Sequence, residues 1–260
     1  MTAALTALDV QAPVAWLRLE RPRALNALNR ALAAELEATL TEVAGLADVA
    51  VLIVAGRGRA FCAGNDIAEM ADLDAAEAQA HAERLARILD TFARLPQVTL
   101  AAIDGHALGG GLMLALAQDL RIASDRARFG FPEVSLGFNP GYGIARVLDV
   151  LGGATARDLL LTGRTIHASE ALRLGVVNRV VAAATLEASA MAWAREIARA
   201  PREALSATKA IVAALRNGGR GEEPARFGAL LRPGAPARER LQTFLERKGR
   251  GPELKSERLD

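Results

Sequence analysis

The sequence predicts an α/β protein followed by a helical C-terminal portion. Two runs that are apolar throughout, 50–55 and 98–103, have the length of strands, and helical periodicity separates them. Strands without polar alternation are buried on both faces, as in a largely parallel sheet. Aromatic residues make up only 4% of the chain, which favours helices packed on small side chains over an all-β sandwich. We expect an α/β core over 1–200 and a helical region over 201–260, with Pro201 at the boundary.

The elements begin in β–α–β order. Residues 5–8 and 14–19 predict a hairpin. Asn29 is a suitable N-cap for a helix whose Leu32, Leu36, Leu40 and Val43 recur on one face. Later elements are strands at 50–55, 98–103, 119–123 and 176–181, and helices at 74–95, 112–117, 143–151, 153–161, 168–174, 184–199 and 202–216, with two more before Lys248.

Composition narrows the class of protein. The 260-residue chain has one cysteine, Cys62, which excludes an internal disulfide framework and fits a reducing compartment. Its 3 histidines are scattered without the spacing of a metal site, so we expect no metal. The N-terminus lacks a basic, apolar leader, and no run approaches the roughly 18 apolar residues of a membrane span. We expect a cytoplasmic protein without membrane contact.

The net charge of +2 is unevenly distributed. Between Arg226 and Arg258 the chain carries an excess of Lys and Arg over Glu. This segment is either a solvated helical face or a surface for a phosphate-rich small ligand. Nucleic acid is the least favoured partner, because no aromatic stacking platform accompanies the charge.

Two glycine-bearing loops, 61–66 and 105–111, follow the two apolar strands. Glycine lets backbone N–H groups approach a ligand closely, and two such loops at neighbouring strands can aim two donors at one oxygen, as in an oxyanion hole. The alternative is that the glycines only allow close helix–sheet packing. Nucleotide sites are disfavoured, because the chain lacks both the Gly-Lys-Ser/Thr of a P-loop and the third glycine of a dinucleotide fingerprint.

Glu133 is the candidate acid/base. It is the only charged residue between Phe129 and Phe138. Apolar surroundings raise a carboxyl pKa, which suits proton transfer. The alternative is a Glu favoured at a helix start after Pro132.

These motifs resemble the crotonase superfamily, the enoyl-CoA hydratase/isomerase family. The likeness spans about residues 10–250 and rests on the segments 21–28, 61–67, 107–111, 129–133, 136–141 and 161–177. It implies a crotonase-like core of repeated ββα units in a spiral, and C-terminal helices that build a homo-trimer or a hexamer of two trimers. It also implies an acyl-CoA thioester substrate, a place in fatty acid metabolism, and no cofactor beyond the coenzyme A that the substrate carries.

The resemblance also assigns site residues. The backbone N–H groups of Asn65 and Gly110 would form the oxyanion hole, and Glu133 would transfer the proton. Substrate-binding positions are implied at Arg23, Ala24, Leu25, Ala63, Gly64, Asp66, Ile67, Leu108, Gly109, Met113, Pro132 and Gly141. Of these, the 23–25 segment and the 63–67 loop would line the coenzyme A site, the loop around the adenine. Tyr142 either donates a hydrogen bond to the substrate or packs at a helix entry.

Met113 departs from the family pattern. Enoyl-CoA hydratases carry a second Glu two residues after the third glycine, and methionine can neither exchange a proton nor orient water as a carboxylate does. One carboxylate can still move a proton between the α and γ carbons, so the implied activity is double-bond isomerisation ahead of hydration. A non-catalytic homologue that binds acyl-CoA or RNA is the remaining hypothesis.

Overall fold

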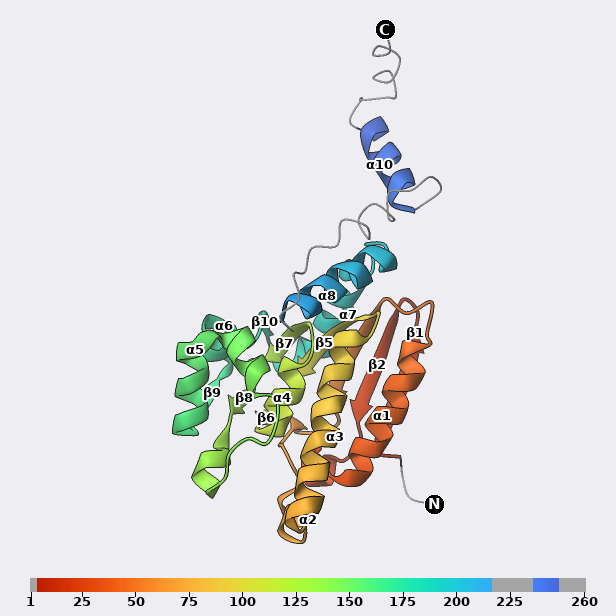
Figure 1. Cartoon of the computed structure of the whole chain (residues 1–260). Coiled ribbons are helices and arrows are strands. Elements are labelled where there is room, and N and C mark those ends of the chain that lie inside the picture. The colour runs from red at the N-terminus through yellow and green to blue at the C-terminus, as the bar shows by residue number, and fades with distance from the viewer. Residues whose placement is uncertain (1–3, 217–235, 248–260) are drawn as a thin grey trace. The chain divides into compact units, whose positions relative to one another are not determined.

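The computed structural model describes residues 4–216 and 236–247 (Figure 1). The chain divides into two compact units, 1–199 and 200–260. Two sheets and the helices around them form the first unit. The predicted α/β class is confirmed.

The larger sheet has the strand order β1-β2-β3-β5-β7-β10. Its strands are β1 Thr6–Gln11, β2 Val14–Leu19, β3 Val51–Gly56, β5 Val98–Ile103, β7 Leu120–Ser124 and β10 Arg179–Val181. β1 and β2 form the predicted antiparallel hairpin, and every other pairing in this sheet is parallel. All six residues of β5 are buried, as expected for an apolar run covered on both faces.

A second sheet, absent from the elements predicted by periodicity, has the order β4-β6-β8-β9. Its strands are β4 Ala60–Cys62, β6 His106–Leu108, β8 Arg128–Gly130 and β9 Thr165–His167. Each has 3 residues, too few to show a period. β4 and β6 are parallel neighbours, and each overlaps one of the predicted glycine loops. The loops follow β3 and β5 along the chain as predicted, and pairing of β4 with β6 places them side by side.

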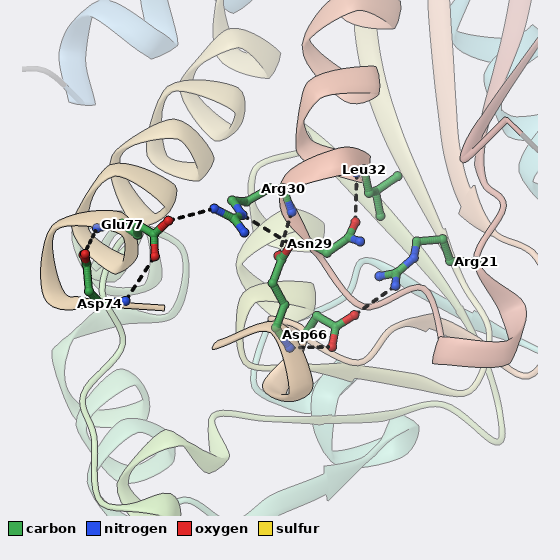
Figure 2. Close-up of polar contacts among 8 residues, drawn as sticks. Arg21, Asn29, Arg30, Leu32, Asp66, Asp74 and Glu77 are labelled. Carbon is green, nitrogen blue, oxygen red and sulfur yellow. Dashed lines mark hydrogen bonds and ion pairs between the residues drawn. The ribbon is translucent and has the colours of Figure 1, made fainter. Parts of the chain in front are cut away.

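Two long helices lie side by side in the first unit (Figure 1). Helix α1, Arg30–Ala44, begins as predicted at Asn29, whose side chain accepts a hydrogen bond from Leu32 N at 2.9 Å. Helix α3, Ala75–Arg94, begins with a capping box between Asp74 and Glu77 (Figure 2). Such caps satisfy N–H groups of the first turn that have no partner within the helix.

The remaining helices complete the first unit. They are η1 Pro22–Ala24, α2 Ile67–Ala71, α4 Gly110–Leu116, η2 Pro132–Leu136, α5 Ile144–Thr162, α6 Ala168–Arg173, η3 Ala183–Thr185 and α7 Leu186–Ile197. The two helices predicted over 143–161 form α5, in which Gly152 takes a non-helical conformation with φ 70° at the predicted break. Helix α7 packs on β2, β3, β5 and β7, while α4 packs on β4 and β6.

The second unit contains α8, Arg202–Arg216, and α10, Pro236–Arg247. They confirm the predicted helix at 202–216 and one of the two predicted before Lys248. The other falls outside the described residues. Among the helices that the structure describes, none combines the length and apolarity needed to cross a bilayer.

Candidate active site

The segment 21–28 is fixed against the second sheet by a buried asparagine. Asn26 has a left-handed backbone with φ 57°, and its side chain is fully buried. Its Oδ1 accepts from Arg21 N at 2.9 Å, and its Nδ2 donates to the carbonyls of Arg57 and Ala60 at 3.0 and 2.8 Å. Asparagine adopts this conformation more readily than most residues, and here its amide is fully used.

The first glycine loop is held by this segment. Leu28 N donates to Gly64 O at 2.7 Å, and Asp66 N donates to Leu28 O at 3.0 Å. The Asp66 carboxylate caps α2 and forms an ion pair with Arg21 at 2.9 Å (Figure 2). Burial opposes ionisation of Asp66, but hydrogen bonds from Arg21 and Glu69 N outweigh it and lower its pKa. Asp66 therefore stays charged and fixes the loop.

The two glycine loops pack backbone to backbone. A Cβ at Gly111 would lie 2.0 Å from the Cys62 carbonyl oxygen, and one at Gly64 would lie 2.9 Å from that of Leu108. Neither position has room for a side chain, because backbone carbonyls cannot move aside. Close packing is therefore one reason for these glycines, as the alternative interpretation holds.

The backbone amides of Asn65 and Gly110 stand where the loops meet. The Asn65 side-chain oxygen lies 2.7 Å from the point that a Cβ of Gly110 would occupy, so the two residues are neighbours. Within the described residues, neither of these two N–H groups donates a hydrogen bond. Both residues line a cavity of about 390 Å³. Close packing and two free donors are thus compatible features of the same loops.

Glu133 is a buried acid in the wall of this cavity. It is 9% exposed, and its Oε2 has no hydrogen-bond partner in the described part of the chain. Burial raises the pKa of this carboxyl above its ordinary value. Its other oxygen, Oε1, would lie only 2.7 Å from a Cβ at Gly109, so glycine there lets the carboxyl approach the loop. Glu133 also starts η2 directly after Pro132, so both features predicted for it occur together.

Two more cavity residues meet the loops. The Tyr142 hydroxyl donates to Asn65 Oδ1 at 2.5 Å, and burial raises the pKa of Tyr142, so it remains a donor. Met113 is 1% exposed on α4 and lines the cavity near Gly143.

Cys62 is buried beneath the loops, and desolvation raises the pKa of its thiol to about 12, which keeps it protonated. In 4–216 and 236–247, no three His, Cys, Asp or Glu side chains gather as metal ligands would.

Comparisons with known proteins identify the family of this chain. The family model described as enoyl-CoA hydratase/isomerase matches residues 9–248. A Mycobacterium bovis protein named "probable enoyl-CoA hydratase" is 43% identical over 203 residues, which cover 76% of this chain and 77% of that protein. The chain belongs to the enoyl-CoA hydratase/isomerase family.

Solved structures of family members extend the likeness to the whole fold. A crystal structure of an enoyl-CoA hydratase from Bacillus anthracis has a TM-score of 0.86 at 31% identity, covering 95% of this chain and 97% of that one. An enoyl-CoA hydratase/carnithine racemase from Magnetospirillum magneticum has a TM-score of 0.87 at 31% identity, covering 96% and 95%. The predicted crotonase-type fold is confirmed, and the protein is an acyl-CoA enzyme of this family.

The cavity brings together most of the predicted site residues of this family member. Those that line it are Ala63, Gly64, Asn65, Ile67, Gly109, Gly110, Met113, Pro132, Glu133 and Gly141. Five predicted positions lie outside the lining: Arg23, Ala24, Leu25, Asp66 and Leu108. Asp66 is engaged with Arg21, and the Leu108 carbonyl faces Gly64. Contact of the 23–25 segment with coenzyme A stays a prediction.

Two polar cavity residues, Tyr142 and His81, have features that the sequence did not predict. The sequence left two roles open for Tyr142, substrate contact and packing at a helix entry. In the structure its hydroxyl donates a hydrogen bond to the Asn65 side chain, which is a third role. His81 projects from α3 and lines the cavity. In the sequence it is one of several residues on the buried face of a helix. No motif marks it, and only the burial of both ring nitrogens distinguishes it.

Proposed function

We propose that this protein isomerises the double bond of an enoyl-CoA, with Glu133 as the single acid/base. The observation that carries the proposal is that, among the described residues, Glu133 is the one carboxylate in the cavity lining. Met113 also lines the cavity, at the position where the resemblance implies a second Glu in hydratases. The Asn65 and Gly110 amides would stabilise the enolate oxygen formed when a proton leaves the α or γ carbon.

The local geometry supports this proton transfer. A carboxyl with a raised pKa is a stronger base than an exposed one and can return the proton to the same substrate. The buried Met113 side chain adds no group that would hold a water molecule against the dienolate. Proton removal from one carbon and delivery to another then conserves all atoms of the substrate.

Hydration is the second candidate, because relatives of this chain are named enoyl-CoA hydratases. Hydration requires a water molecule to be activated. By the family resemblance, enoyl-CoA hydratases activate it with a pair of carboxylates. A catalytically inactive acyl-CoA binder is the third. Substrate turnover separates the three functions.

The test is incubation of the pure protein with 2-enoyl- and 3-enoyl-CoA panels, followed by mass spectrometry and NMR. Isomerisation moves a 3-enoyl to a 2-enoyl chain without change in mass, whereas hydration adds one water. Glu133→Gln should keep acyl-CoA binding and lose at least about 100-fold in turnover, as expected for loss of general acid–base catalysis. Hydrated product from the wild type, or undiminished turnover in Glu133→Gln, would refute the proposal.

We further propose that the active assembly is a homo-trimer or a hexamer of two trimers. The exposed apolar side chains of η2 and α5 support association between copies of the chain. The proposed partner of the site is an acyl-CoA thioester.

A further inference from the structure

His81 is a buried polar side chain that the proposed reaction does not use. It projects from the second turn of α3, is 5% exposed, and lines the same cavity as Glu133. Neither ring nitrogen has a hydrogen-bond partner among the described residues. Burying a polar group without a partner destabilises a protein, so such a group in a cavity calls for a ligand.

Each of the other polar side chains of the cavity makes at least one hydrogen bond or has a proposed role in the reaction. Asn65 and Tyr142 bond to each other, and Asn139 Nδ2 donates to the Pro140 carbonyl at 2.9 Å. Glu133 retains one unpartnered oxygen, which proton transfer explains. His81 is thus the remaining polar side chain of the lining whose hydrogen-bonding groups are unused.

The wall around His81 is apolar. From α3 it is flanked by Ala78 and Ala82, and α2 contributes Ile67 and Met70. Desolvation lowers the pKa of His81, although Glu69 and the nearby Leu28 carbonyl, which does not reach hydrogen-bond geometry, oppose this. At neutral pH the ring is therefore uncharged, with one donor and one acceptor nitrogen. Such a ring suits a neutral hydroxyl better than a carboxylate.

We propose that His81 hydrogen-bonds a hydroxyl on the acyl chain, so that the preferred substrates are hydroxylated acyl-CoAs rather than plain hydrocarbon ones. This inference rests on the proposed function, because it places the acyl chain in the cavity that holds Glu133. His81 then determines specificity and takes no part in proton transfer.

The test uses saturated acyl-CoAs, which bind but cannot isomerise. Binding of hexanoyl-CoA and of 4-, 5- and 6-hydroxyhexanoyl-CoA is measured by calorimetry for the wild type, His81→Phe and His81→Gln. One net hydrogen bond predicts that at least one hydroxylated chain binds the wild type about 2- to 10-fold more tightly than hexanoyl-CoA. His81→Phe should abolish this preference, and His81→Gln, which keeps a donor and an acceptor, should retain part of it.

Thermal unfolding without ligand separates recognition from a structural role. Because the ring nitrogens have no partners in the described residues, His81→Phe should unfold at the same or a higher temperature than the wild type. His81→Leu repeats the test with a smaller side chain if phenylalanine does not fit.

Three results would overturn the inference while leaving the proposed function intact: no preference for any hydroxylated chain in the wild type, a preference that survives in His81→Phe, or equal weakening of all four ligands. Failure of every acyl-CoA to bind would overturn both.

Discussion

The Glu133 carboxyl is buried, which disfavours its charged form. We therefore expect both turnover and folding stability to depend on pH. The raised pKa of Glu133 means that the base form is lost on acidification at a pH above the ordinary value of 4.5. We expect kcat/KM for a 3-enoyl-CoA to fall on the acid side with an apparent pKa above 4.5, and this limb should report the free enzyme.

The same shift affects stability with the opposite dependence on pH. Below the unfolded-state pKa both states are protonated, and burial of Glu133 then costs least. As pH rises from the unfolded-state pKa to the higher folded-state pKa, the unfolded chain ionises more readily than the buried group, so stability is lost; above the folded-state pKa the loss is complete. Glu133→Gln removes this loss, so its melting temperature should exceed that of the wild type increasingly from acid to neutral pH. A constant difference across that range would contradict the assigned burial effect.

At the scale of elements, two glycines of the second loop differ in what surrounds them. A Cβ at Gly110 would meet side chains, whereas a Cβ at Gly111 would meet backbone. A Cβ at Gly110 would lie 2.3 Å from the Tyr142 hydroxyl, which can move, whereas one at Gly111 would meet the Cys62 carbonyl, which cannot. We expect Gly110→Ala to fold but to lose turnover, up to the about 100-fold typical of a lost oxyanion donor. Gly111→Ala should instead be destabilised by about 1–3 kcal/mol or more through overpacking.

A second substitution checks this assignment. Adding Tyr142→Phe to Gly110→Ala removes the oxygen closest to the new methyl group and should recover part of the lost turnover. Melting curves and kcat are measured for each variant. Equal loss of stability in Gly110→Ala and Gly111→Ala, or no recovery in the double variant, would show that the loops are packed differently.

Most elements long enough to show a period could be predicted from the sequence, whereas the 3-residue strands of the second sheet could not. The six-residue run of β5 and the 20-residue amphipathic α3 carry their own signals. β4 and β6 have 3 residues each and exist because the neighbouring backbone pairs with them. Propensity and periodicity are properties of a local window, so pairing between distant short segments lies beyond them.

The site shows the same division at single residues. Glu133 could be predicted because it is an isolated charge in an apolar stretch next to a proline. His81 could not, because within α3 it is one position on the buried face, beside Leu85 and Ile88. Its significance comes from α2 and the 140–142 loop, which close the cavity over it from other parts of the chain.

At the scale of the whole molecule, apolar side chains exposed on η2 and α5 connect the proposed site to the proposed assembly. They are Val134, Leu136, Ile144 and Leu148, between 37% and 59% exposed. Single exposed apolar residues are ordinary, but a group on two elements that pack together marks an interaction surface. Because η2 also carries Glu133, contact with a second copy at this surface would hold the catalytic segment in place.

Light scattering on the pure protein should therefore give three or six times the chain mass of 27.4 kDa. Leu148→Glu buries a charge at the proposed contact and should lower this mass towards that of one chain, and turnover should fall with it. Val10→Glu, which changes a similarly exposed residue on β1 (47% against 40%), is the matched control and should leave both unchanged. If Leu148→Glu keeps the wild-type mass, the η2 and α5 surface is not the contact; if it dissociates but retains full turnover, η2 holds Glu133 in position without help from a second copy.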